Sequence, residues 1–323
     1  MRKRSTAARS WTRLLAFLGF AVLSLMVIVL YGLTTVGAWQ RSLLLGAGMT
    51  LITAAVVAAL VRQSRALKRI RRSPPLDRSA LFDFAGVVGG AWITYLVSVD
   101  LELGPVVASA LIGLLGGLLI PAHGAAIYCG SFAGMSSAAL LANGVEMLLA
   151  GTVAGVVYVL ARGTMTGFGG GLGTTAFAGT VFTGLGFRRI FAPAPMPAPP
   201  LAWRIVLYAM VGALLTYWLS VPLKHGPVIG SSVVGLVGGL LLPTLEPEAG
   251  TLLAVAVFCA SFTGMSSPKR LPGAPWLTVA GLITGVAFVI SLPVLGGAGG
   301  KLGTLALGAS TATWVVRTYL SRA

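Results

Sequence analysis

Long runs of apolar residues, separated by short polar or glycine-rich stretches, set the pattern of this chain. The first two runs extend from Trp11 to Trp39 and from Leu43 to Val61. Each is close to the ~20 residues that a helix needs to cross a bilayer. A helix satisfies its own backbone polar groups in lipid, and the period-two pattern of an outer-membrane barrel is absent. The pattern therefore predicts an all-α polytopic membrane protein that begins with a transmembrane hairpin.

The rest of the chain repeats itself at two fixed spacings. The run IGLLGGLLIP at 112–121 matches VGLVGGLLLP at 234–243, at a spacing of 122 residues. After a short insertion at 246–248 the spacing is 130, where CGSFAGMSS at 129–137 matches CASFTGMSS at 259–267. At the same spacing GGGLGT at 169–174 matches GGKLGT at 299–304. These matches indicate an internal duplication.

The duplication divides the chain into four parts: an N-terminal transmembrane hairpin with basic flanks at 1–80, a first membrane repeat at 81–187, a Pro/Arg-rich linker at 188–204 and a second membrane repeat at 205–323. The linker holds five prolines and three arginines, which is typical of an extended connector. Each repeat is expected to hold five helical membrane segments.

In the first repeat these segments are predicted at 84–99, 105–121, 124–142, 144–162 and 172–187. Five crossings would make the two repeats inverted relative to each other, a common plan among transporters. The length of 124–142 favours this arrangement, whereas a re-entrant 124–142 would make the repeats parallel, and the charges do not decide between them.

Charge placement predicts the orientation. Only 9% of the residues are charged, against about a quarter in soluble domains. Of the 23 Lys and Arg, 13 lie before residue 80, where they flank the hairpin. The positive-inside rule then places both termini on the cytoplasmic side of an inner (plasma) membrane. An apolar core of more than 20 residues argues against a cleaved signal peptide, and the basic stretch at 62–78 either fixes topology or binds anionic lipid or another protein.

The duplicated SFxGMSS motif is the first candidate for a substrate path. It puts a glycine and three hydroxyls into a stretch that would otherwise cross the bilayer, where such groups need internal partners or a watery cavity. One interpretation is a broken or re-entrant helix that lines a path between the repeats, where the phenylalanines narrow the path. The alternative is a close contact of helices through small residues. The candidate residues are Ser131, Phe132, Gly134, Met135, Ser136, Ser137, Ser261, Phe262, Gly264, Met265, Ser266 and Ser267.

The two glycine clusters are the second candidate. Clustered glycines allow an unwound chain, and a helix that starts after them would direct free amides toward an anion or a carbonyl oxygen. A flexible loop between helices is the alternative. Lys301 faces Gly171 in the alignment, so it either gives the path one positive charge or extends to the surface. The candidate residues are Gly169, Gly170, Gly173, Thr174, Gly299, Gly300, Lys301, Gly303 and Thr304.

The sequence carries no catalytic signature. A Ser-His-Asp order, HExxH and a Walker lysine are all missing, and His123 and His225 fall at non-equivalent positions in the repeats. We therefore expect no enzyme, no catalytic residue and no cofactor. Ion-coupled pumps usually hold a carboxylate within the membrane, but the acidic residues after the hairpin are expected near helix ends or in loops, which favours passive movement. These residues are Asp83, Asp100, Glu102, Glu146, Glu246 and Glu248.

The two cysteines are soft-metal candidates. Cys129 and Cys259 fall at equivalent positions, with Met135 and Met265 six residues further on. Thiols and thioethers suit Cu(I), but a spacing of six does not match a helical turn, and a lone cysteine in an apolar helix is usually a small hydrophobe. The expectation is therefore that the chain binds no metal.

These patterns together predict an integral membrane transport protein, a facilitator or channel for a small neutral or anionic solute that passes between the two repeats. The expected partners are the lipid bilayer and a small-molecule or ion substrate, and no binding of nucleic acid is expected. A homo-oligomer is possible. One alternative is an ion-gradient-coupled secondary transporter, and another is a non-transporting membrane assembly or scaffold subunit. The plan of two five-helix repeats is similar to that of urea-type channels in architecture alone, because their signature residues are absent.

Overall fold

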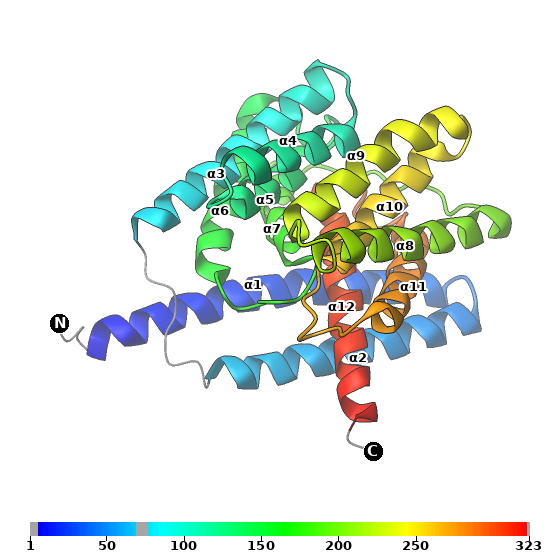
Figure 1. Ribbon diagram of the computed structural model, residues 1–323, viewed down its shortest axis with the longest axis horizontal. Coiled ribbons are helices and arrows are strands. Elements are labelled where there is room, and N and C mark those ends of the chain that lie inside the picture. The colour runs from blue at the N-terminus through cyan, green and yellow to red at the C-terminus, as the bar shows by residue number, and fades with distance from the viewer. Residues whose placement is uncertain (1–5, 69–76, 322–323) are drawn as a thin grey trace.

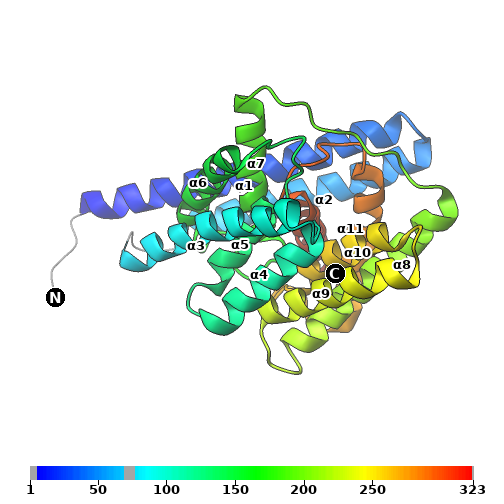
Figure 2. The same cartoon turned by 90° about the horizontal axis from the view of Figure 1, so that it is seen from above.

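The computed structural model describes residues 6–68 and 77–321, and every regular element in these two ranges is helical (Figure 1). The predicted all-α class is therefore confirmed. Helices α1 (Thr6–Trp39) and α2 (Leu43–Lys68) form the expected N-terminal hairpin, in which the hydroxyls of Thr35 and Thr53 lie 2.8 Å apart. The hairpin runs along one side of the bundle in both views (Figures 1 and 2). The basic residues at 2–4, 69–72 and 322 lie outside the described ranges.

Ten further α-helices follow the hairpin within the described residues 77–321. The first five are α3 (Arg78–Tyr95), α4 (Pro105–Leu119), α5 (Gly124–Gly134), α6 (Gly144–Ala161) and α7 (Gly171–Gly186), and a single π-helical segment, Leu96–Asp100, extends α3. The second five are α8 (Pro199–Ser220), α9 (Pro227–Leu245), α10 (Gly250–Gly264), α11 (Ala274–Ser291) and α12 (Lys301–Leu320).

Local sequence explains where several of these helices begin. The side chain of Asp77 accepts a hydrogen bond from the Ala80 amide at the start of α3, and Asn143 caps α6 in the same way. Proline occupies the first turn of α4 and α9, where its missing N–H costs nothing. Each of these prolines follows a glycine with positive φ, Gly104 or Gly226. The chain is thus turned sharply before both helices.

Seven of the described helices are long and apolar enough to cross a membrane, as expected of a membrane protein. They are α1, α2, α3 with its π-helical extension, α6, α8, α9 and α11. Helices α4 and α10 are apolar but shorter. By their length and composition, these seven helices can therefore span a membrane.

Two predicted boundaries are wrong. The segment 124–142 is not one helix, because α5 ends at Gly134 after 11 residues, or ~16 Å, and residues 135–143 follow without helical structure. The extended linker is also shorter than the predicted 188–204, since α8 already begins at Pro199. Proline is compatible with the first helical turn, so the proline-rich composition concealed this start.

Helices α7 and α12 occupy the centre of the bundle and cross each other at their first turns. A Cβ atom built on Gly173 would lie 2.6 Å from Cα of Gly303, so only glycine permits this approach. Helix α12 then runs across α1 and α2 (Figure 1). The Tyr31 hydroxyl donates to the Leu305 carbonyl at 2.7 Å, which anchors the N-terminal hairpin to α12.

Candidate functional site

Two chain junctions at the centre of the bundle are built in the same way. We call residues 167–172 together with 265–267 the first junction, and residues 297–302 together with 135–137 the second junction. In the first, the Gly169 amide donates to Ser266 Oγ at 3.0 Å and the Ser267 amide donates to the Gly167 carbonyl at 2.9 Å.

The second junction repeats both bonds. The Gly299 amide donates to Ser136 Oγ at 3.0 Å, and the Ser137 amide donates to the Gly297 carbonyl at 2.9 Å. The end of each SFxGMSS motif is therefore tied to the glycine cluster from the other half of the chain.

Glycine is required at the helix start in each junction. Gly170 and Gly300 precede α7 and α12 with φ values of +90° and +82°, a left-handed conformation that side chains rarely adopt. A Cβ atom on either glycine would also lie 2.3 Å from a backbone carbonyl oxygen, that of Gly303 or Gly173. The GGxLGT repeats thus build a tight contact of two unwound segments.

Four aromatic side chains fill the space between the halves of the chain. Tyr128 and Phe132 come from α5, and Phe258 and Phe262 come from α10 at a spacing of 130 residues. The rings of Phe132 and Phe262 are 4.5 Å apart between centroids, and all four side chains are almost completely buried. This aromatic cluster separates the two junctions.

Buried hydroxyls surround the aromatic cluster. Ser109 pairs with Ser131 at 2.9 Å, and Ser231 pairs with Ser261 at 2.8 Å. The Tyr128 hydroxyl lies 2.9 Å from Ser231 Oγ. Because these hydroxyls bind each other, they serve first to satisfy buried polar groups inside the bundle.

A cavity of about 670 Å³ opens beside the first junction. Gly169, Gly170 and Gly171 line one wall, and Phe132 and Phe262 of the aromatic cluster also line it. The cavity therefore reaches from the surface to the aromatic cluster. Its size is within the usual range of small-molecule sites.

At the second junction a lysine stands in the position of Gly171. Lys301 is 9% exposed, and its ammonium group donates to the Ser291 carbonyl at 2.6 Å. Ser291 is the last residue of α11, so the charge faces the negative end of the α11 dipole. The equivalent residues at the first junction, Ala161 and Gly171, both line the cavity.

Asp83 and Arg162 line the cavity, and together with His123, which pairs with Asp83, they form what we call its charged border. Asp83 on α3 lines the cavity and lies 2.7 Å from His123 Nδ1 and 3.4 Å from Arg162 Nη2. Arg162 also lies 3.7 Å from Asp77. Asp83 lies near the start of α3, as its sixth residue, and its side chain is buried. A carboxylate is therefore present within a helix that can span the membrane.

Arg270, in the loop between α10 and α11, closes the first junction toward the surface. Its guanidinium group lies 4.1 Å from the centroid of the Phe168 ring and donates to Gln63 at 3.2 Å and to the Thr166 carbonyl at 3.3 Å. Partial burial lowers the pKa of this guanidinium. The contact with Gln63 attaches the first junction to the end of α2.

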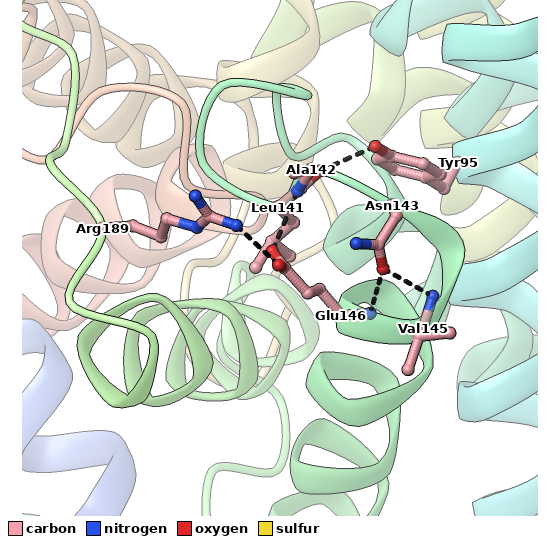
Figure 3. Close-up of polar contacts among 7 residues, drawn as sticks. All are labelled: Tyr95, Leu141, Ala142, Asn143, Val145, Glu146 and Arg189. Carbon is pink, nitrogen blue, oxygen red and sulfur yellow. Dashed lines mark hydrogen bonds and ion pairs between the residues drawn. The ribbon is translucent and has the colours of Figure 1, made fainter.

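A different ion pair holds the chain that follows α5. Figure 3 shows Glu146, at the start of α6, accepting from the Ala142 amide at 2.9 Å and from Arg189 at 2.6 Å. In the same close-up the Tyr95 hydroxyl donates to the Leu141 carbonyl at 2.7 Å. The non-helical segment 135–143 is thereby fixed against α3 and the start of the linker.

The predicted path residues separate into groups in the structure. Six of them line the cavity, and the others form the second junction, the serine pairs and close helix contacts. Gly134 and Gly264 would bring a Cβ atom within 2.5 and 2.3 Å of carbonyl oxygens on α3 and α8, so both lie at tight helix contacts.

The cavity group is Phe132, Gly169, Gly170, Phe262, Met265 and Ser267. The second-junction group is Met135, Ser136, Ser137, Gly299, Gly300 and Lys301, whereas Ser266 belongs to the first junction. Ser131 and Ser261 form serine pairs, and Gly173 and Gly303 form the helix crossing. The hydroxyls of Thr174 and Thr304 donate back to the carbonyls of Gly170 and Gly300.

Both cysteines are buried and free, and each thiol donates to a backbone carbonyl. Cys129 contacts Leu172 at 3.2 Å and Cys259 contacts Leu302 at 3.3 Å. The two thiols therefore secure the starts of α7 and α12.

Sequence reasoning missed the charged border of the cavity. Asp83, His123 and Arg162 come from three separate elements and have no counterpart in the second half of the chain, so the duplication did not reveal them. The only signal available in the sequence was a carboxylate directly before the predicted apolar segment 84–99.

Comparison with known proteins gives no match: no protein-family model, no curated protein and no solved structure matches this chain.

Proposed function

We propose that the chain is an integral membrane transport protein, a facilitator or channel for a small neutral or anionic solute. The observation that carries this proposal is the cavity that reaches the aromatic cluster between the two halves of the chain. Gly169 to Gly171 offer backbone groups to a solute, and Phe132 and Phe262 close the inner end of the cavity. Rearrangement of these rings would connect the cavity to the second junction.

We further propose that the two halves are inverted repeats with five crossings each. Gln63, at the end of α2, donates to the Thr164 carbonyl and accepts from Arg270, which puts loops 162–170 and 265–273 at one end of the bundle. Ser137 binds Gly297, which puts loops 135–143 and 292–300 together. Helix α6 separates 135–143 from 162–170, so the two equivalent loops 162–170 and 292–300 start at opposite ends of the bundle and converge where Gly170 and Gly300 contact the starts of α12 and α7.

In this arrangement α5 and the following residues 135–143 make one broken crossing, and the non-helical residues before α7 and α12 enter the membrane from opposite sides. Basic residues at the ends of α2 and α12 put the mouth of the cavity on the cytoplasmic side of the inner membrane. Two arginines on the other side, Arg189 and Arg204, are paired with Glu146 and Glu246. Their charge is compensated, which is consistent with both termini being cytoplasmic.

One observation favours a second candidate, an ion-gradient-coupled transporter. The buried Asp83 borders the cavity, and carboxylates within membrane helices commonly serve in ion or proton transfer. The two candidates differ in whether a solute moves down its own gradient alone.

The test is reconstitution of the full chain in liposomes, followed by flux of urea, glycerol, chloride and nitrate with and without proton or sodium gradients. The proposal expects at least one of these solutes to move faster than in protein-free vesicles. Movement without an ion gradient supports the facilitator, and movement only with such a gradient supports the coupled transporter. Background rates for all four solutes under every condition would contradict transport of these classes.

A further inference from the structure

The charged border of the cavity occurs at the first junction alone. Its carboxylate, Asp83, lies 2.7 Å from His123 Nδ1 and 3.4 Å from Arg162 Nη2. The residues that match Asp83 and Arg162 in the second half are apolar, Ile205 and Leu292. This cluster is therefore not part of the framework that both halves share, and the buried framework does not require it.

The pairing of Asp83 with His123 distinguishes the two ring nitrogens. An ionised carboxylate only accepts hydrogen bonds, so beside an ionised Asp83 the Nδ1 atom of His123, at 2.7 Å, carries a hydrogen that is directed at Asp83. The other ring nitrogen, Nε2, is then the atom that can take up a further proton. Among protein side chains, histidine is the one that ordinarily gains and loses a proton near neutral pH.

The surrounding elements set the charge of the cluster. Asp77 caps the start of α3 and Asp83 lies within α3, Tyr158 lies on α6 and Arg162 directly follows it, and His123 lies in the loop before α5. The two titratable groups on α5 are already hydrogen-bonded, Tyr128 to Ser231 and Cys129 to the Leu172 carbonyl. The formal charge of Asp77, Asp83, Arg162 and His123 together is −1 when His123 is neutral and zero when it is an imidazolium.

We propose that Asp83 and His123 form a proton-binding site, and that passage of solute through the cavity is linked to a proton held there. The proton binds Nε2 of His123, the imidazolium remains paired with Asp83, and the formal charge of these four residues rises from −1 to zero. An anion meets less repulsion in this state, so the solute class that the site favours is a monovalent anion moving together with a proton. This inference rests on the proposed transport function, and within it selects the second candidate, the ion-gradient-coupled transporter.

The experiment uses the full chain in liposomes loaded with a pH-sensitive dye, with an inward nitrate gradient and the membrane potential clamped. Nitrate is chosen because its conjugate acid does not cross the bilayer at neutral pH. The variants are Asp83→Asn, which keeps the shape of the side chain, and His123→Gln, which replaces the ring by a polar side chain that does not titrate. His225→Gln is the matched control, since His225 is exposed and is the only other histidine in the chain. Detergent gel filtration confirms that each variant folds.

The expected result is that nitrate entry acidifies the vesicles with wild type and with His225→Gln. With His123→Gln and Asp83→Asn the acidification falls to the level of protein-free vesicles, and nitrate flux loses its dependence on pH between 6 and 8. Nitrate entry without acidification in the wild type, or an unchanged acidification with His123→Gln, overturns the proton site and leaves the facilitator intact. If neither nitrate nor chloride enters but urea or glycerol does, the inferred anion class is wrong. If chloride enters in place of nitrate, the same acidification is expected with chloride, and its absence overturns the proton site. If none of the four solutes enters, the transport function itself fails and this inference fails with it.

Discussion

The two junctions share a backbone framework and differ in what fills the space beside it. Both tie a serine of the SFxGMSS motif to a glycine amide at 3.0 Å, and both start a helix after a glycine with positive φ. At the first junction Gly171 leaves a cavity, whereas at the second the Lys301 side chain extends to the Ser291 carbonyl. A duplicated framework can thus keep its buried hydrogen bonds while the residue beside it changes from a glycine that lines a cavity to a buried lysine.

The largest loss of stability is expected when the glycines with left-handed backbone conformation at the two junctions are replaced. Gly170→Ala and Gly300→Ala each add strain of about 1–3 kcal/mol from the left-handed conformation. Each also adds about 1–3 kcal/mol from the clash with a facing carbonyl. Thermal unfolding in detergent should show a large loss of stability for both variants. Gly171→Ala is the control, because its Cβ would meet only the Met165 Cβ, at 3.7 Å. A wild-type melting temperature for Gly170→Ala would show that the first junction is not built as described.

The serine bonds give the next largest effect. Ser136→Ala and Ser266→Ala each leave a buried glycine amide without an acceptor, which costs about 1–3 kcal/mol. The shared framework predicts that the two variants lose the same stability within about 0.5 kcal/mol. Chemical denaturation of both, beside the exposed control Ser321→Ala, measures this difference. A cost at one junction only would mean that the two frameworks are not equivalent.

The ion pair of Figure 3 should contribute less. Glu146→Gln keeps an acceptor for the Ala142 amide but loses the charge that faces Arg189. Because the Arg189 side chain is 36% exposed and solvent screens the pair, the expected loss is about 0.5–1 kcal/mol. The exposed Glu248→Gln, which has no ion pair among the described residues, is the control in the same melting assay. Equal melting temperatures for the two variants would show that this ion pair does not hold the segment 135–143.

The smallest effect is expected for Lys301→Met. The buried ammonium group has a carbonyl as its partner and no carboxylate, so an apolar side chain of similar length should leave stability unchanged or raise it by about 1 kcal/mol. Lys269→Met, at an exposed position, is the control. A fall in melting temperature by several degrees would mean that the lysine holds the second junction together.

The helical class and the N-terminal hairpin could be predicted from the length of the apolar runs. The two motifs could be singled out because each occurs twice in the sequence. The sequence could not predict that Ser136 and Ser266 bind glycine amides from the other half, since that pairing depends on how distant segments meet. The proton site was hidden for the same reason. Asp83 and His123 are 40 residues apart, and only the packing of α3 against α5 brings them together.

The central claim is that the cavity at the first junction is the solute path, and Gly171→Trp tests it most directly. Gly171 lines the cavity and has room for a side chain, so tryptophan there fills the cavity without displacing the backbone. The matched variant is Gly186→Trp, at the other end of α7, where a Cβ would meet no atom within 4 Å. Flux of whichever solute the wild type transports should be lost in Gly171→Trp and kept in Gly186→Trp, with similar melting temperatures. Undiminished flux through a folded Gly171→Trp protein would contradict the account.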